Sequence, residues 1–347
     1  MGAAAAEGDV AVAVVADGIT YPRKMSAMET LMSVPNRRIA WRESVRLLLA
    51  VLVGALVVTG ARAAAPAPAQ KLFATPDDAV SALVLAVKAG DRNAMLAALG
   101  NVGEWLSSGD ATADQAAAAR FLSDYDEKHT VVRDGDKATL TIGNEDFPFA
   151  FPLEKSGEQW RFGTAPGKEE LLARRIGGNE LSSIKVLQAI VDAEQEYASE
   201  DRTGDGVPAY AQRIVSRPGK RDGLYWPTKD GELQSPLGVL AAQAADEGYK
   251  RSEPPPAPYH GYFYRMLKGQ GKNAESGAFD YVVHGRGIAG FAVVAYPARY
   301  ANSGIMTFIV NQDGKIYQAD LGPETKAKAE GMQRFDPGKG WTAVDAK

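Results

Sequence analysis

The sequence contains no cysteine among its 347 residues. This absence excludes disulfide bonds, thiol catalysis, cysteine-ligated zinc and the acylation of a lipoprotein cysteine. Stability therefore has to come from packed cores. The 284 residues after position 63 are enough for one large domain or two ordinary domains.

Histidine and the common catalytic motifs are also scarce. The three histidines are His129, His260 and His284, and no HExxH or GxSxG motif occurs. The GxG spacings at 269–271 and 285–287 lack the strand, turn and helix that a phosphate-binding loop needs. The sequence thus gives little support to a zinc enzyme, a serine hydrolase or a nucleotide-binding protein.

Basic residues are not in excess. The net charge is -4, and it becomes -6 once residues 1–63 are removed with their seven basic and five acidic side chains. An acidic chain without a basic run argues against nucleic acid as a partner.

No apolar stretch of bilayer-spanning length follows the arginines at 37, 38, 42 and 46. The run Leu47–Thr59 has thirteen residues, short of the roughly 20 that a membrane span needs. With Ala61-Arg62-Ala63 after it, this run predicts a Sec-type signal peptide cleaved near Ala63/Ala64, although Arg37-Arg38 leaves a twin-arginine signal as an alternative. We therefore expect a periplasmic or secreted protein without a stable membrane anchor, whose translation starts at Met1 or at Met25, Met28 or Met32.

After a short linker at 64–70, residues 71–166 favour a small α+β domain. Helical patterns at 76–89, 92–99 and 112–129 precede strand-like runs with turns at Asp134-Gly135 and Ser156-Gly157. Helices followed by an antiparallel meander are typical of this fold class.

Residues 168–347 predict a second α+β domain. A long amphipathic helix ends near Ser199, with Gly177-Gly178 expected to break or bend it and Asn179 to cap the portion after the break. From 259 onward the chain is strand-like, with a hairpin at Asp313-Gly314. We expect the helix to lie across one face of a four- or five-stranded antiparallel sheet.

Several motifs carry a family resemblance. NELSSIKVLQAIVDAEQEYAS, DGLYWP, PYHGYFYRML, AFDYVVHGRGIAGFAVVAYPARY, SGIMTFIVNQDGKIYQADLG and FDPGKGW occur in this order. Together they resemble the bacterial envelope family of unknown function, number 2950 (domain of unknown function 2950), which implies an exported protein but no activity. The helix reaching EYAS and the strands after it are more faintly similar to the globular domains of type IV pilins and type II secretion pseudopilins. Here the helix is internal and amphipathic, so the likeness implies a pilin-like shape and not filament assembly.

An acidic loop comes after the long helix and has two interpretations. Glu200, Asp201 and Asp205 are candidate calcium ligands, but Thr203 and Gln212 stand where an EF-hand needs further carboxylates. Alternatively, Gly204 and Gly206 supply positive φ in a tight turn while the aspartates bind nearby amides. No other cofactor is expected.

Aromatic residues form the second candidate site. Tyr225, Trp226, Tyr259, His260, Tyr262 and Tyr264 are candidates to line a groove for a glycan or a peptide. The alternative is that these rings fill the core.

The sequence favours an exported, non-catalytic envelope protein that acts as a binding or scaffolding module for an envelope protein, a peptide or a glycan. The competing hypothesis is a periplasmic hydrolase that uses carboxylates or His260.

Overall fold

The computed structural model describes residues 69–229, 231–250 and 257–344. The predicted signal peptide and the start of the mature chain lie outside these ranges. In the described parts of the chain, no helix is both long enough and apolar enough to cross a membrane.

The described chain begins with three helices, each capped by a side chain at its N-terminus. Thr75 and Asp78 form a capping box at the first helix, while Asp91 and Asp110 cap the second and the third. These helices are α1 (Pro76–Lys88), α2 (Arg92–Leu99) and α3 (Ala111–Glu127). Their existence and order confirm the sequence prediction.

A five-stranded antiparallel sheet comes after the three helices. Its order is β1-β2-β4-β5, with β3 paired to β2. The strands are β1 (His129–Asp134), β2 (Lys137–Ile142), β3 (Phe147–Pro148), β4 (Leu153–Ser156) and β5 (Gln159–Phe162). Leu140, Leu153 and Phe162 point from this sheet into a core shared with Leu83 of α1.

The next element, α4 (Thr164–Ala198), is one continuous helix of 35 residues, so the predicted break at Gly177-Gly178 is wrong. A glycine costs a helix about 1 kcal/mol relative to alanine, but packing at both ends outweighs that cost. Leu171 packs on the core under β1–β5, and Leu187 and Ile190 lie in the second core.

Asn179, predicted to cap a helix, instead lies inside α4. Its side-chain amide donates to the Ser303 carbonyl at 2.8 Å. The neighbouring Glu180 carboxylate accepts from the Ile305 and Met306 amides at 2.9 and 3.0 Å. The middle of the helix is thereby bonded to the second sheet.

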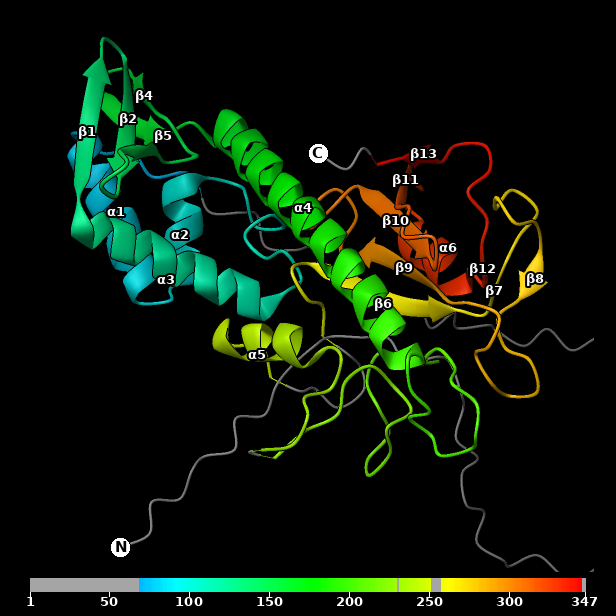
Figure 1. Ribbon diagram of the computed structural model, residues 1–347. Helices are drawn as coiled ribbons and strands as arrows, with labels where there is room; N and C mark the ends of the chain where they lie inside the picture. The colour runs from blue at the N-terminus through cyan, green and yellow to red at the C-terminus, as the bar shows by residue number, and fades with distance from the viewer. Residues whose placement is uncertain (1–68, 230, 251–256, 345–347) are drawn as a thin grey trace, which may run out of the picture. The chain divides into compact units, whose positions relative to one another are not determined.

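That second sheet is five-stranded and antiparallel, in the order β13-β11-β10-β9-β6, as predicted for an α+β fold. Figure 1 shows α4 crossing it. The strands are β6 (Tyr262–Leu267), β9 (Ala292–Pro297), β10 (Met306–Asn311), β11 (Tyr317–Asp320) and β13 (Thr342–Ala343).

Both faces of this sheet are covered. Val293 and Ala295 of β9 pack in the core under α4, whereas Val294 and Tyr296 pack in another core with Ala329 of α6 (Thr325–Gly331). Alternate residues of a strand point to opposite faces, so β9 is buried throughout.

The remaining elements lie around this sheet. A small three-stranded sheet has the order β12-β7-β8, and β12 runs parallel to β7. These elements are α5 (Gly238–Asp246), β7 (Gly269–Gln270), β8 (Phe279–Asp280) and β12 (Arg334–Phe335).

Hydrogen bonds join the segments before and after α4, and the described residues fall in one compact unit. Arg299 and Asn302 both donate to the Ser107 carbonyl at 2.9 Å, and Arg175 donates to the Trp105 carbonyl at 2.8 Å. The two five-stranded sheets are separate. The predicted domain boundary near residue 167 stays a prediction, and α4 runs across it.

Candidate functional site

The segment between α4 and α5 forms a closed basic loop, Arg217–Asp222. The Arg217 amide donates to the Asp222 carboxylate at 2.9 Å, and the Lys220 amide donates to the Arg217 carbonyl at 2.9 Å. At the base of the loop, the Ser216 amide donates to the Tyr225 carbonyl at 2.8 Å. The loop is therefore fixed by its own polar groups.

Gly223 permits this closure. An added Cβ there would lie 2.7 Å from the Ser216 nitrogen, which no larger residue tolerates without a backbone shift. The Ser216 hydroxyl accepts from the Gly223 amide at 3.0 Å and so completes the base of the loop. Glycine is needed here for close backbone approach.

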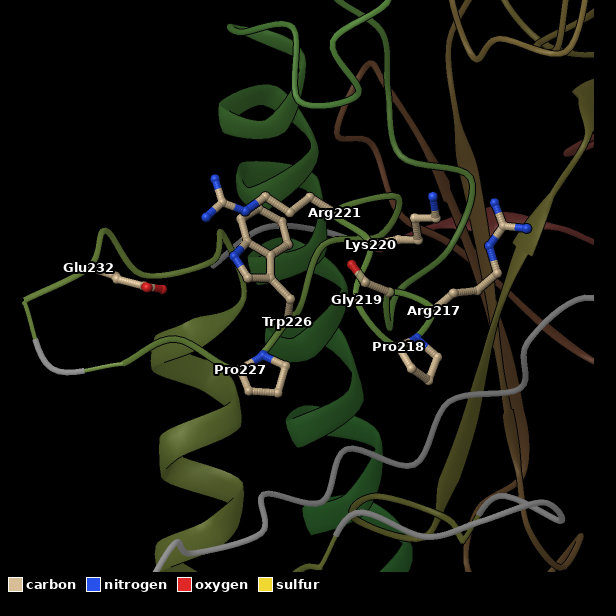
Figure 2. Close-up of a pocket in the computed structure, with 9 residues that line it drawn as sticks. Arg217, Pro218, Gly219, Lys220, Arg221, Trp226, Pro227 and Glu232 are labelled. Carbon is tan, nitrogen blue, oxygen red and sulfur yellow. The ribbon is translucent and has the colours of Figure 1, made fainter.

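The basic loop borders a cleft of about 420 Å³. Figure 2 shows the side chains around it. The lining residues are Ser216, Arg217, Pro218, Gly219, Lys220, Arg221, Trp226, Pro227 and Glu232.

Trp226 forms the inner wall of the cleft and is only 6% exposed. Its ring meets the Tyr197 ring edge-on, and the Arg221 guanidinium lies 5.5 Å from the indole centre. Tyr197 donates its hydroxyl to the Arg221 carbonyl at 2.6 Å, and burial raises the pKa of Tyr197 to about 12. These contacts fix the orientation of the indole.

The indole Nε1 of Trp226 is buried and has no hydrogen-bond acceptor among the described residues. Most buried polar groups in proteins are paired. The unpaired Nε1 is therefore an unusual buried donor in a residue that also lines the cleft.

The charges around the cleft are unequal. Arg217 is ion-paired with Asp222. Burial by itself would raise the pKa of Asp222, but hydrogen bonds from Arg217 and the positive charges of Arg217 and Arg213 hold that pKa below its ordinary value. In the part of the chain that the structure describes, Lys220 and Arg221 have no ion-pair partner. Among the lining residues that the structure describes, Glu232 is the single acidic one, and it accepts from the Lys229 amide at 3.4 Å.

The aromatic candidates are divided between the cleft and the core. Trp226 lines the cleft, and Tyr225 next to it is half-buried. Tyr259, Tyr262 and Tyr264 are fully buried under α4, so their rings present no surface to a ligand. The structure brings these three tyrosines together as core, as the alternative interpretation expected.

His260 lies in a tight turn at a positive φ of 48°, which is unusual for a residue with a Cβ. Its Nε2 is 3.1 Å from Oε2 of Glu247, just after α5, and both side chains are about one third exposed. His260 is thus paired with Glu247, whereas His284 is exposed in a turn after β8. His129 Nδ1 donates to the Tyr125 carbonyl at 2.8 Å, and the imidazole stacks on the Tyr125 ring.

The acidic turn, Asp201–Gly206, is a tight turn closed by hydrogen bonds from its own backbone amides. The Asp201 carboxylate accepts from the Gly206 and Gly204 amides at 2.7 and 2.8 Å, and these bonds lower its pKa. Both glycines have positive φ. Asp205 pairs with Arg286 at 2.9 Å and Glu200 with Arg202 at 3.2 Å.

Calcium binding at the acidic turn therefore stays a prediction. Across residues 69–229, 231–250 and 257–344, no group of three or more His, Asp or Glu side chains is arranged to hold a metal ion.

Sequence reasoning missed Arg217, Lys220, Arg221 and Glu232 as site residues. The signal was present, since RPGKRDGLYWP places three basic residues within ten positions of a Tyr-Trp pair. The many turn residues of this segment obscure its combination of charged and aromatic side chains.

Comparison with known proteins adds a family and no activity. No curated protein and no solved structure matches this chain. A family model described as "Protein of unknown function (DUF2950)" matches residues 70–344. Because this match spans most of the sequence and includes the cleft, the chain belongs to the DUF2950 family.

Proposed function

We propose that this protein is an exported, non-catalytic binding module of the cell envelope, and that it holds an anionic group of its ligand in the cleft beside the basic loop. The predicted signal peptide supports export. The shape and chemistry of the cleft support binding, because a closed loop, a fixed indole and unpaired cations surround one cavity.

A single observation carries the proposal: Lys220 and Arg221 line one cleft with Trp226, and among the described residues neither cation has an ion-pair partner and the buried indole Nε1 has no acceptor. Hydrogen bonds from charged donors contribute about 1.5–3 kcal/mol each when their partner is well placed. On an otherwise acidic chain, this local positive charge selects ligands with carboxylate or phosphate groups. Envelope glycans, peptides and proteins carry such groups.

Export is tested by fractionating cells that make the protein from its own signal sequence. We expect the stable form to begin near Ala64 and to be recovered without detergent. A stable protein that retains Leu47–Thr59 would contradict this part of the proposal.

Binding is tested by sedimenting the purified mature protein with insoluble cell-wall polymer. The double variant Lys220→Gln/Arg221→Gln should lose most of the sedimented fraction, while Lys272→Gln, an exposed lysine away from the loop, should not. Binding should weaken as salt rises, because the Debye length falls to about 8 Å at 0.15 M. Equal sedimentation of all three proteins would refute the cleft as the binding site.

A second candidate function is hydrolysis with His260 as general base. The observation that favours it is the Glu247–His260 pair, since a carboxylate that orients imidazole is a common catalytic arrangement. His260→Gln should then abolish cleavage of envelope glycan or peptide while binding through the cleft is retained. Equal cleavage by both proteins would remove this candidate.

A further inference from the structure

We infer that the ligand group held in the cleft is an acidic sugar, a pyranose that carries a carboxylate. This inference rests on the proposed binding function and adds the ligand class. It derives from the distribution of charge around the cleft, from the unpaired indole N–H and from the hydrogen bonds that several loop amides already make within the segment.

The cleft has two chemically different sides. In the view of Figure 2, Glu232 lies on one side of Trp226 and Lys220 on the other, with Arg221 across the indole. Lys220 and Arg221 suit a carboxylate. Glu232 accepts hydrogen bonds and repels a second negative charge, so the opposite end of the ligand has to offer hydroxyl or amine donors.

Trp226 contributes an edge and not a stacking face. Arg221 covers the ring at 5.5 Å, so a sugar does not stack on that face of the indole. The Nε1 donor is buried, unpaired and on the side of the ring toward Glu232 in Figure 2. In the proposed complex, a ring oxygen or hydroxyl oxygen of the ligand accepts from this donor.

Two prolines supply the apolar part of the site. Pro218 and Pro227 both line the cleft and are exposed. Their rings match the C–H faces of a pyranose, which are apolar although the hydroxyl rim is polar. The volume of about 420 Å³ lies within the range of roughly 300–1,000 Å³ typical of small-molecule pockets.

A peptide fits this cleft less well. Extended peptides are usually held by main-chain hydrogen bonds to an open strand edge. Here the amides of Ser216, Arg217 and Lys220 are already bonded inside the loop. A bare inorganic phosphate would use the cations but would leave Glu232 and the indole N–H unsatisfied.

The test is an NMR titration of the mature protein with glucuronic acid, glucose, inorganic phosphate and the dipeptide alanyl-alanine. The chain after residue 63 has four indole N–H signals, from Trp105, Trp160, Trp226 and Trp341. Trp226→Phe removes one signal and keeps a ring, which assigns the Trp226 N–H. The other three signals report whether the variant is folded.

We expect glucuronic acid to shift the Trp226 signal and to bind at least about tenfold more tightly than glucose, the equivalent of one charge-assisted hydrogen bond. Lys220→Gln/Arg221→Gln should weaken glucuronic acid binding by about tenfold or more, and Glu232→Gln and Trp226→Phe should also weaken it. Lys272→Gln should leave it unchanged.

Other outcomes overturn the inference. Phosphate binding as tight as glucuronic acid, strengthened by Glu232→Gln, would identify a general anion site. Tighter binding of alanyl-alanine would identify a peptide site. If no probe shifts the Trp226 signal while cell-wall sedimentation still depends on Lys220 and Arg221, the acidic-sugar inference fails and the binding function stands. If sedimentation is also independent of them, both fail.

Discussion

Asp110 offers a sharp test of how the segments before and after α4 are held together. Its carboxylate is 1% exposed and accepts three hydrogen bonds. One comes from the Ala113 amide at 3.0 Å, which caps α3. The other two come from the Tyr249 hydroxyl at 2.9 Å and the Gly261 amide at 3.0 Å, which belong to the distant half of the sequence.

Replacing Asp110 with alanine removes all three bonds. Loss of the cap costs about 1 kcal/mol. The Tyr249 hydroxyl and the Gly261 amide are then buried donors without an acceptor, at about 1–3 kcal/mol each. The expected loss is about 4 kcal/mol of unfolding free energy, a large part of the roughly 5–15 kcal/mol that stabilises a typical domain.

Asp91 provides the matched control. It caps α2 through one bond, to the Ala94 amide at 3.0 Å, and it is exposed. Asp91→Ala should therefore cost only about 1 kcal/mol. The difference between the two variants, about 3 kcal/mol, isolates the bonds to Tyr249 and Gly261.

The measurement is urea-induced unfolding followed by circular dichroism, with melting temperature as a second readout. At roughly 2–4 °C per kcal/mol for chains of this order of size, Asp110→Ala should lower the melting temperature by about 10 °C. Tyr249→Phe should account for part of the loss and be non-additive with Asp110→Ala. Equal losses for Asp110→Ala and Asp91→Ala would refute the assigned role of the network.

Three further predictions concern the region where α4 ends. Glu194 is fully buried, and burial raises its pKa well above the ordinary value near 4.5 despite an opposing bond from the Ala211 amide. The folded protein therefore keeps a proton that unfolding releases, and stability should fall above pH 4.5 by about 1.4 kcal/mol per pH unit until the folded pKa is reached. Glu194→Gln should lack this slope in pH-dependent urea unfolding, and parallel curves for the two proteins would contradict the assignment. At the acidic turn, Gly206→Val should lower the melting temperature because φ is 86°, whereas Gly177→Val, at an open helical position, should be better tolerated. If calcium binds the folded turn, it should raise the wild-type melting temperature, and Asp205→Asn should remove that increase. If the turn binds no calcium, a chelator should leave the melting temperature unchanged.

Local sequence determined the elements whose signals lie within a few residues. The turns at Gly135, Gly157 and Gly314 have the positive φ that glycine adopts easily, and the strands on either side pair as predicted. The alternation of residues in YFYRML places Tyr262 and Tyr264 on one face of β6 and Phe263 on the other, and these residues pack in two different cores. A period of two is a property of the strand itself, so it needs no knowledge of the rest of the fold.

Only the tertiary structure decided whether those faces are covered. Tyr262 and Tyr264 are buried because α4 lies over them, and the opposite face is buried by α6, which the sequence pattern did not indicate. The continuity of α4 through Gly177 has the same origin, because packing against two cores outweighs a weak local preference.

The candidate site divides in the same way. The closing bonds of the basic loop join residues no more than about ten positions apart, so the local sequence contains the information that defines the loop. The local sequence does not define the unpaired Trp226 N–H, because the burial of this group depends on α4 packing beside it. The local sequence also does not define the hydrogen bond between Asp110 and Tyr249, which joins residues 139 positions apart. Sequence periodicity reports which residues share a face, but contacts between distant segments depend on how those faces pack against one another.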